Sequence, residues 1–498
     1  MRKCSESLET KSCEIVMMQS TFVIEMNLSW KMIESTNDVS QFSELLQAFR
    51  DRYNCEAEYV VKSPGRMNII GEHIDYSGYP VLPMAVNECI YAAFSVNQNS
   101  EELTVCNTDT EYEPFEALYS YFITSCKNLS WKDYFLTGVV AAMDHIEEYQ
   151  YKASEDAEVK LTFKGFKAMI SSKLPERRGL AISTALVCCA AARTMVAVGD
   201  GNFRTITKEN LAELCSQYEN ADLVRGPMDN LICFTARQGA VGEIYSVQSA
   251  SSRRCHFAAE CSFSGFPLWT SIDEKCNVSF VQEACDGMSF SNKIFGLDWR
   301  EINTIREVQD AVGDIDDNTF KEIALSPFRQ VSYTIAEIIR FLQCNESELD
   351  ILRGRRYRTK EQFYLKRRAR HVIEESMRVK EFRSICDQFA NGQLSEDLCL
   401  SKLGKLLDDS HHSCSYFYDC TCEELDFIQQ MFKKFGAIGS RLTGLGWGGP
   451  VVALIDAERA ESFKESIEQY IAGSAFRSYK PFFVSPGQGL QIFSLPHN

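Results

Sequence analysis

The chain has 498 residues, more than one hydrophobic core usually supports, so two domains with a ligand site between them are the first expectation. Hydrophobic residues make up 45% and charged residues 24%, values near globular averages that exclude a disordered or fibrous class. The net charge of -17 disfavours nucleic acid and anionic membranes as partners and favours small-molecule chemistry.

The N-terminal residues include acidic side chains and no sustained apolar core, so they do not form a secretory signal. Residues 1–25 also lack periodicity and are predicted to be poorly ordered. The first amphipathic helix is predicted over residues 39–53, with an apolar face formed by Phe42, Leu45, Leu46 and Phe49. The 20 cysteines are scattered, which indicates reduced thiols in the cytoplasm and disfavours a secreted disulfide framework.

Residues 63–86 combine dense polar chemistry with loop-forming residues, in the run S-P-G-R-M-N-I-I-G-E-H-I-D-Y-S-G-Y-P-V-L-P-M-A-V. Carboxylates and an imidazole can hydrogen-bond to sugar hydroxyls, and a guanidinium can stabilise charge on a phosphoryl group. An isolated Glu-His pair would more often belong to an ordinary solvated turn. The whole run, however, resembles the galactokinase signature almost position for position.

The resemblance to the galactokinase and N-acetylgalactosamine kinase family, within the GHMP kinases, implies a role for each polar residue of this run. Glu72, His73 and Asp75 would bind hydroxyls of a galactose-like ring. Arg66 would lie beside the anomeric oxygen and the transferred phosphate, as one of two catalytic residues.

A strand is predicted over residues 90–96. A second segment of interest lies at residues 175–190 and has the sequence P-E-R-R-G-L-A-I-S-T-A-L-V-C-C-A. It has the pattern of a loop that opens into a hydrophobic helix, where free N–H groups and the helix dipole favour an anion. Many loops precede buried helices without binding anything, so this segment alone is weak evidence. The apolar stretch at residues 184–198 is shorter than a membrane span and contains Arg193, which indicates a buried helix.

In the family, small residues follow this proline, and Gly-Leu and a run of serines come next. The resemblance therefore implies ATP as the phosphoryl donor and four nucleotide-binding residues, Gly179, Leu180, Ser183 and Thr184. Here Glu176, Arg177 and Arg178 replace small residues, and Ala181 and Ile182 replace hydroxyls. Either the two arginines pair with the phosphates and become nucleotide-binding residues, or their bulk weakens the nucleotide and magnesium site.

A helix is predicted over residues 205–219. By the resemblance, Ser183 and Glu219 are candidate Mg²⁺ ligands, although Glu219 lies one residue too close to Asp229 for the family's pattern. The run R-G-P-M-D-N-L-I-C-F-T-A-R-Q-G resembles the family's Gly-x-Met-Asp-Gln segment and makes Asp229 the second catalytic residue. An aspartate there could accept the proton of the anomeric hydroxyl, with Arg66 near enough to bias its ionisation. The alternative is an ordinary aspartate at a helix N-terminus.

Small and polar residues at 248–254 follow an apparent strand around residues 242–247 and mark the best candidate for a domain boundary. The predicted division is a poorly ordered segment at 1–25, an N-terminal GHMP kinase domain at 26–250 with the sugar and phosphate loops, and a C-terminal GHMP kinase domain at 251–498. Mixed helix and strand signals predict an α+β class. By the resemblance, the active site lies in the cleft between the two domains.

Two further features have a plain structural interpretation. The basic run at residues 353–370 could attract phosphates, but it is predicted to be a solvated helix face with a buried stripe at Leu365, Ala369, Val372, Ile373 and Met377. The histidines and cysteines among residues 411–422 match no tetrahedral zinc spacing, so structural thiols are expected there.

Near the C-terminus, the run S-R-L-T-G-L-G-W-G-G-P follows a predicted helix that ends at Gly436. A glycine-rich turn permits close backbone approach to a ligand, but alone it is weak evidence. Together with the preceding S-H-H-S-C-S-Y-F-Y-D-C-T-C-E-E-L-D, this stretch resembles the N-acetylgalactosamine kinase branch most. Leu445 and Pro450 depart from small residues in the family, and Pro450 also lacks an N–H donor.

These patterns predict an ATP-dependent kinase that phosphorylates the anomeric hydroxyl of galactose or N-acetylgalactosamine, with Mg²⁺, in the cytoplasm. Its partners would be the sugar and ATP, without nucleic acid or membrane. The altered phosphate loop motivates an alternative, a catalytically weakened relative that binds sugar and nucleotide and acts through a protein partner. Residues 271–303, near the family's sugar-selective positions, match poorly and leave the choice of sugar open.

Overall fold

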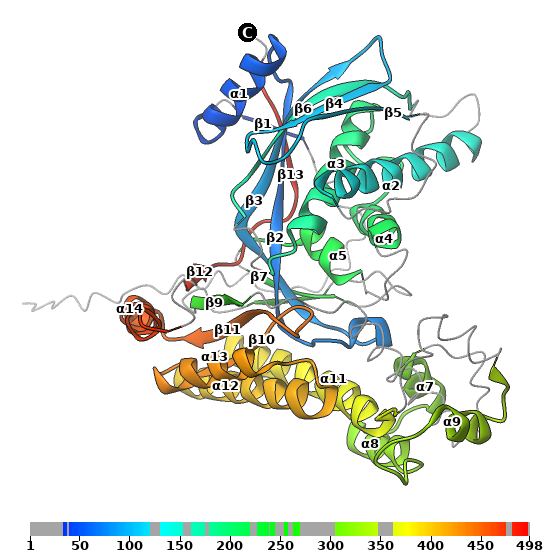
Figure 1. The fold of residues 1–498 in the computed structure, drawn as a ribbon, viewed down its shortest axis with the longest axis vertical. Coiled ribbons are helices and arrows are strands. Elements are labelled where there is room, and N and C mark those ends of the chain that lie inside the picture. Colours follow the sequence, from blue (N-terminus) through cyan, green and yellow to red (C-terminus); the bar gives the residue numbers. More distant parts are fainter. Residues whose placement is uncertain are drawn as a thin grey trace, which may run out of the picture.

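The computed structural model describes residues 33–36, 39–119, 130–152, 161–174, 179–219, 227–238, 240–244, 253–256, 262–268, 304–346, 362–474 and 481–496, with only the backbone of residues 253–256 and 262–268. A large mixed sheet with its helices forms one part of the molecule, and a smaller antiparallel sheet with a layer of long helices forms the other (Figure 1). This architecture confirms the predicted α+β class.

The larger sheet has seven strands in the order β1-β13-β2-β3-β6-β4-β5. Its strands are β1 (Ile33–Ser35), β2 (Tyr59–Ile70), β3 (Leu82–Asn97), β4 (Glu102–Asn107), β5 (Phe115–Leu118), β6 (Gly165–Ser172) and β13 (Gln491–Ser494). Strand β13 comes from the far end of the chain and pairs with β1 and β2. Both ends of the described chain therefore contribute to this sheet.

Helices cover the two faces of the larger sheet (Figure 1). One face carries α1 (Ser43–Tyr53), and the other carries α2 (Trp131–Lys152), α3 (Ile182–Ala197), α4 (Lys208–Glu219) and α5 (Met228–Thr235). Helix α3 contacts β2 and β3 and is buried almost all round. The side chain of Arg193 is buried as well. Its Cζ atom lies 3.2 Å from the ring centroid of Phe166, and burial lowers the pKa of the guanidinium to about 9. The predicted buried helix is thus confirmed.

The smaller sheet has the strand order β10-β11-β9-β12. Its strands are β9 (Ser262–Leu268), β10 (Gly439–Leu442), β11 (Gly449–Ile455) and β12 (Phe482–Val484). Its helices are α11 (Leu365–Ala390), α12 (Glu396–Ser413), α13 (Glu423–Lys434) and α14 (Ala460–Ile471). A π-helical turn, η5 (Cys414–Tyr418), continues α12.

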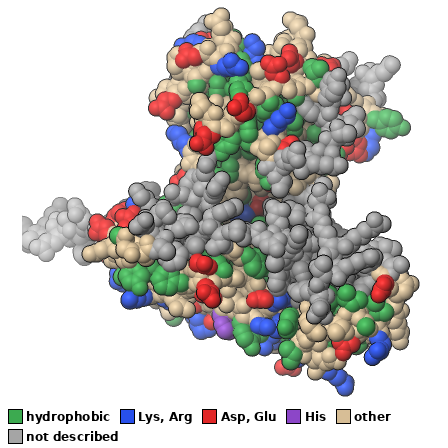
Figure 2. Space-filling view, viewed as in Figure 1, with side chains coloured by type: hydrophobic (Ala, Val, Ile, Leu, Met, Phe, Trp, Pro, Cys, Tyr) green, Lys and Arg blue, Asp and Glu red, His purple; other side chains and the backbone are tan. Residues whose placement is uncertain are grey.

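The remaining elements lie outside these two layered parts. They are the paired strands β7 (Ala240–Glu243) and β8 (Arg253–His256), and the helices α7 (Ile305–Val312), α8 (Asp317–Leu325) and α9 (Ile335–Leu342). Acidic and basic side chains are interspersed over both lobes of the face shown in Figure 2. Among the helices that the structure describes, none is both long and apolar enough to cross a bilayer.

Most predicted elements are confirmed. The helix expected over residues 39–53 is a 3-10 turn, Ser40–Phe42, followed by α1, and the strand expected over residues 90–96 is part of β3. Helix α13 ends at Lys434, just before Gly436, whose φ is +105°. The basic helix, α11, begins only at Leu365, and residues 353–361 lie outside the described residues, as does most of the predicted boundary at 248–254.

The helix predicted over residues 205–219 begins three residues later, at Lys208. The cause is Asp200, whose carboxylate accepts the backbone N–H groups of Arg204 and Thr205, both at 2.8 Å. The N–H groups that would open the helix are therefore already satisfied by a side chain. Thr207 follows, and its hydroxyl accepts the N–H of Asn210 at 3.1 Å, as an N-terminal cap does.

Candidate active site

Arg66 and Asp229 form the centre of the candidate active site. Arg66 lies in β2 and Asp229 is the second residue of α5. The Nε atom of Arg66 donates to Oδ1 of Asp229 and its Nη2 atom donates to Oδ2, both at 2.5 Å. Such a two-point ion pair fixes the orientation of the carboxylate. The Asp229 side chain is still 21% exposed, so part of it remains open to a substrate.

The same arginine is tied to the start of the phosphate loop. Its Nη1 atom donates to the Gly179 carbonyl at 2.9 Å, and its backbone N–H donates to the Leu180 carbonyl at 3.0 Å. Burial alone would lower the pKa of Arg66, but the charge and hydrogen bonds of Asp229, with smaller contributions from Cys233 and Glu72, together outweigh burial and raise it. Arg66 is therefore a fixed positive charge that joins the predicted catalytic aspartate to the predicted nucleotide loop.

Residues 71–78, which follow β2, are here called the sugar loop, and Glu72 is buried within it. Its Oε2 atom accepts hydrogen bonds from Arg441 Nη1 at 2.5 Å and Asn68 Nδ2 at 2.6 Å. Its Oε1 atom accepts the backbone N–H of Gly444 at 2.7 Å. Burial raises the pKa of Glu72, and the charge of Arg441 partly opposes that rise. The structure thus places this carboxylate in a network of protein contacts.

His73 is held on both sides of its ring. The imidazole stacks on Tyr418, with ring centroids 4.3 Å apart and an interplanar angle of 13°. Its Nδ1 atom lies 2.9 Å from the Tyr76 hydroxyl and its Nε2 atom lies 3.0 Å from the Leu445 carbonyl. Burial lowers the pKa of His73 to about 3, so the ring is neutral at pH 7. The carbonyl can only accept, so Nε2 donates to it and Nδ1 accepts from the hydroxyl.

Asp75 begins a 3-10 turn, Asp75–Ser77, and is 9% exposed. Burial raises the pKa of this carboxyl to about 7, and the charge of Asp229 adds to the rise. Asp75, in the loop after β2, and Asp229, in α5, therefore interact electrostatically. Two neighbouring carboxyl groups suit a polyhydroxylated ligand, because each can accept hydrogen bonds from hydroxyls.

The start of α3 supplies the predicted phosphate site. Gly179 has a φ of +68°, and an added Cβ would lie 2.4 Å from Pro450 Cδ, so only glycine fits here without a shift. Ala181 precedes the helix in a left-handed conformation and provides no side-chain cap. The N-cap side chain therefore leaves the first N–H groups of α3 to an anion, as far as the described residues show. The predicted phosphate ligands Arg177 and Arg178 lie outside the described residues.

The predicted magnesium ligands lie close to this helix start. Ser183 is the second residue of α3 and is partly exposed. The next residue, Thr184, donates its hydroxyl to Glu219 Oε1 at 2.8 Å, and Asn230 Nδ2 donates to Oε2 at 3.1 Å. Glu219, at the end of α4, is thus brought beside the first turn of α3.

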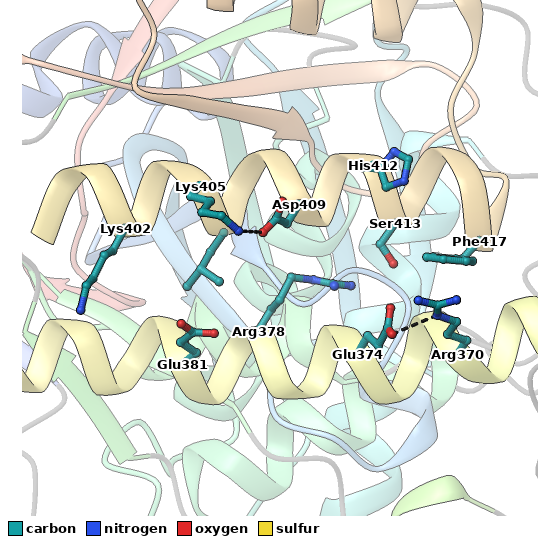
Figure 3. A pocket seen from close by; sticks show the side chains of 11 residues that line it. Arg370, Glu374, Arg378, Glu381, Lys402, Lys405, Asp409, His412, Ser413 and Phe417 are labelled. Carbon is teal, nitrogen blue, oxygen red and sulfur yellow. Dashed lines mark hydrogen bonds and ion pairs between the residues drawn. The ribbon is translucent and has the colours of Figure 1, made fainter. Parts of the chain in front are cut away.

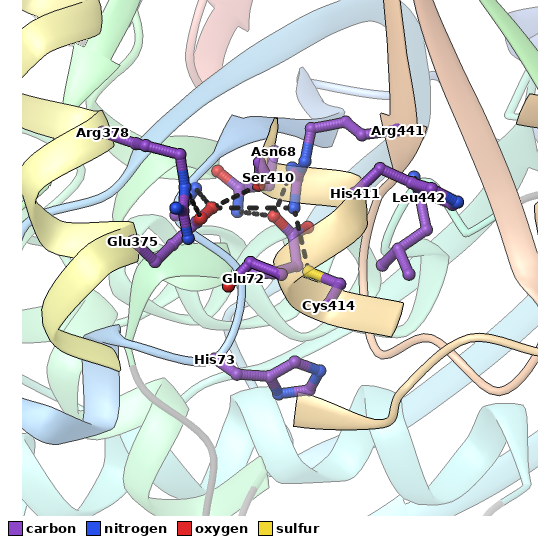
Figure 4. A network of polar contacts seen from close by, with 12 residues as sticks. Asn68, Glu72, His73, Glu375, Arg378, Ser410, His411, Cys414, Arg441 and Leu442 are labelled. Atoms are coloured by element: carbon purple, nitrogen blue, oxygen red, sulfur yellow. Dashed lines mark hydrogen bonds and ion pairs between the residues drawn. The ribbon is translucent and has the colours of Figure 1, made fainter. Parts of the chain in front are cut away.

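Sequence reasoning missed a buried network that fastens the sugar loop to the C-terminal elements (Figure 4). Arg441 of β10 is fully buried, and its Nη1 atom donates both to Glu72 and to the Ile69 carbonyl, the latter at 3.1 Å. Its Nη2 atom lies 4.0 Å from Oε1 of Glu375, a buried residue of α11. That same Oε1 atom accepts the backbone N–H of Gly71 at 3.0 Å. A charged residue among the apolar positions of α11 was the available signal.

Glu375 is ionised within this network. Burial alone would raise its pKa, but the charges of Arg378 and Arg441 lower it to about 2. Arg378 Nε donates to Oε2 at 2.7 Å, and Ser410 of α12 donates its hydroxyl to Oε1 at 2.6 Å. Strand β10 and helices α11 and α12 therefore all contribute to positioning the sugar loop.

Three family signatures match parts of this chain. The galactokinase galactose-binding signature matches residues 47–96, which include the sugar loop. The GHMP kinases N terminal domain matches residues 139–237, which include the start of α3 and Asp229. The GHMP kinases C terminal signature matches residues 394–472, which include Arg441.

Several known proteins resemble this chain over most of its length. A galactokinase from Dictyostelium discoideum is 28% identical over 92% of this chain and 95% of its own. A galactokinase from Candida parapsilosis is 26% identical over 86% of this chain and 88% of its own. The crystal structure of Lactococcus lactis galactokinase complexed with galactose superposes with a TM-score of 0.65 at 20% identity, covering 91% of this chain and 99% of that one. The predicted two-domain GHMP kinase fold is therefore confirmed.

Proposed function

We propose that this chain, which belongs to the galactokinase family of GHMP kinases, transfers the γ-phosphoryl group of ATP to the anomeric hydroxyl of galactose or N-acetylgalactosamine. The observation that carries the proposal is the two-point pair of Arg66 and Asp229, placed between the sugar loop and the start of α3. None of the cysteines whose side chains the structure describes forms a disulfide, which supports a reducing compartment such as the cytoplasm.

In this proposal Asp229 is the general base and Arg66 is its partner. The proton of the anomeric hydroxyl passes to the Asp229 carboxylate as the anomeric oxygen forms a bond to the γ-phosphorus. The bond from that phosphorus to the bridging oxygen breaks, and ADP leaves. Arg66 holds the carboxylate in one orientation and stabilises negative charge on the phosphoryl group in transit.

Asp75, together with Glu72 and His73, is proposed to position the sugar. Asp75 is buried beside Asp229 and can accept hydrogen bonds from ring hydroxyls. Because both carboxylate oxygens of Glu72 and both ring nitrogens of His73 already have protein partners, these two residues would act largely by shaping the sugar loop. Catalysis would then rest on positioning and charge stabilisation.

The nucleotide is proposed to lie at the start of α3, with Gly179 and Leu180 lining its phosphates and Ser183 and Thr184 in the first helical turn. Ser183 and Glu219 would supply the hydroxyl and carboxylate oxygens that magnesium prefers, with Glu219 held beside the helix start by the hydrogen bonds that it accepts from Thr184 and Asn230. When bound, Mg²⁺ would neutralise charge on the phosphates.

The close packing of Pro450 against Gly179, together with the altered phosphate loop, motivates a second candidate function, a regulator that binds sugar and nucleotide and acts through a protein partner. In that case the ring of Pro450 would limit how closely the γ-phosphate approaches Asp229. Phosphoryl transfer would then be slow even though both ligands bind.

The substitution Asp229→Asn tests the assignment of the general base. For the kinase, loss of the base lowers kcat by a factor on the order of 10²–10⁴, because the amide cannot accept the proton. The measurement is formation of sugar 1-phosphate with ATP and Mg²⁺, together with galactose affinity by calorimetry and the circular dichroism spectrum. A variant that stays folded and keeps full turnover would exclude Asp229 as the base.

A further inference from the structure

A groove of about 390 Å³ lies between α11 and α12, away from the residues assigned to phosphoryl transfer. Four basic side chains line it, Arg370, Arg378, Lys402 and Lys405, and Figure 3 shows them along the facing sides of the two helices. This space is called the helix groove below. Its volume lies within the range of about 300–1,000 Å³ that is typical of small-molecule sites.

Three carboxylates, Glu374, Glu381 and Asp409, line the same groove. Two of them are paired along their own helix, because Arg370 Nε donates to Glu374 at 2.9 Å and Lys405 Nζ donates to Asp409 at 2.7 Å. Lys402, in contrast, forms no ion pair with any residue that the structure describes. The groove therefore combines one lysine without a described ion-pair partner with hydrogen-bond acceptors on its carboxylates.

Arg378 is the most constrained of the basic residues. Its side chain is 13% exposed, and its Nε atom donates to Glu375 at 2.7 Å. Its Nη2 atom is buried and has no hydrogen-bond partner within the described part of the chain. A buried N–H group without a partner is costly, so a rotation of the guanidinium toward the groove would let this atom donate a charge-assisted hydrogen bond to a bound acceptor.

From these features we infer that the helix groove is a second binding site, for a small phosphorylated sugar. A phosphate suits Arg378 and Lys402, because guanidinium and ammonium groups bind phosphate oxygens strongly. Hydroxyls suit the carboxylates Glu381 and Asp409, which accept hydrogen bonds. A mixed set of cations and acceptors in one small groove matches a sugar phosphate better than a phosphate alone.

Two short hydrogen-bond paths connect this groove to the sugar loop. Arg378 contacts Glu375, which accepts the N–H of Gly71 at 3.0 Å. Ser413, which also lines the groove, lies 2.9 Å from His371 Nδ1, and the Nε2 atom of that histidine lies 3.0 Å from the Glu72 carbonyl. A phosphate on Arg378 competes with Glu375 for the guanidinium, so occupancy of the groove is expected to loosen the sugar loop and weaken galactose binding.

The binding itself is tested by calorimetry with glucose 6-phosphate, without ATP, so the result does not depend on kinase activity. Saturable binding by the intact protein is expected, with affinity about ten-fold weaker in Lys402→Glu and restored in Lys402→Arg. Lys434→Glu changes an exposed lysine of α13 outside the groove and is the matched control. Absence of binding, or equal weakening in the Lys402→Glu and Lys434→Glu variants, would overturn the site.

Two further arms test the ligand class and the coupling. Inorganic phosphate and free glucose are each expected to bind more weakly than glucose 6-phosphate, and equal affinity for inorganic phosphate would overturn the assignment to a sugar phosphate. Saturating glucose 6-phosphate is expected to raise the Kd for galactose in the intact protein but not in Lys402→Glu. A galactose Kd that does not change in the intact protein would exclude the connection to the sugar loop.

Discussion

The two aspartates beside the proposed sugar site differ in their surroundings. Asp229 is paired at two points with Arg66, whereas burial and the Asp229 charge raise the pKa of Asp75 to about 7. One carboxylate is therefore paired with a cation, whereas the other carboxyl group can carry a proton near neutral pH. A buried carboxyl group with a strongly raised pKa is typical of functional sites.

The raised pKa of Asp75 predicts a pH-dependent stability. The folded protein holds this proton more tightly than the unfolded chain, whose value is 3.8, so stability falls as pH rises from about 4 to about 7. Each pKa unit corresponds to about 1.4 kcal/mol, so Asp75 changes the free energy of unfolding by about 4 kcal/mol at most over this pH range.

Replacing this carboxyl by an amide removes that dependence. Asp75→Asn is expected to be more stable than the intact protein at pH 8, with a smaller difference at pH 4, in urea unfolding followed by circular dichroism. The same variant should bind galactose more weakly, because the amide accepts hydrogen bonds less strongly. An equal stability difference at both pH values would show that Asp75 has an ordinary pKa.

At the scale of single elements, the start of α3 depends on one glycine. Gly179 needs both a left-handed backbone and the space next to Pro450. The glycine and proline belong to segments that are far apart in the sequence, so their contact could not be read from either motif. The sequence indicated only that Pro450 departs from the family's small residues.

Gly179→Ala is expected to reduce the free energy of unfolding by about 2–4 kcal/mol, from the unfavourable φ and from overlap with Pro450. Gly392→Ala is the matched control, because Gly392 has a φ of +70° but no atom within 4 Å of an added Cβ. The control should lose only the free energy that the unfavourable backbone conformation costs, about 1–2 kcal/mol. Equal losses in the two variants, measured by chemical denaturation, would show that Pro450 does not crowd the loop.

Periodicity predicted the elements best where a helix has one clear apolar face. The ends of α1 and α13 agree with their apolar stripes and with Gly436. The start of α4 was predicted too early. The Asp200 carboxylate accepts two backbone N–H groups before the helix, and the periodicity of apolar residues cannot predict such a side-chain contact. The hydrophobic run predicted helix α3, whereas the position of Asp229 came from motif resemblance, and the pairing of Asp229 with Arg66 agrees with that expectation.

At the scale of the whole molecule, one buried arginine connects the part with the smaller sheet to the sugar loop, which follows a strand of the larger sheet. Arg441 lies in the smaller sheet and contacts Glu72, which follows a strand of the larger sheet, and it approaches Glu375 of α11. Single-sequence reasoning could not pair these residues, because long stretches of chain separate them and no motif contains two of them. The return of β13 to the first sheet was missed for the same reason.

Arg441→Met is expected to destabilise the protein by about 3–5 kcal/mol, because it leaves the buried carboxylate of Glu72 without its cation. Adding Glu72→Gln should recover part of this loss, since the second change removes the unpaired charge. Thermal and chemical denaturation of the single and double variants measure the effect. A double variant whose loss equals the sum of the two single losses would mean that the pair does not interact.

The most direct test of the proposed function is phosphorus NMR of the intact protein incubated with ATP, Mg²⁺ and galactose, with N-acetylgalactosamine in a parallel sample. The account predicts consumption of ATP and a new sugar 1-phosphate resonance with at least one of the two sugars. The sugar that reacts faster identifies the preferred substrate. Unchanged ATP in both samples, from a protein that binds galactose in calorimetry, would contradict the kinase and favour the regulator.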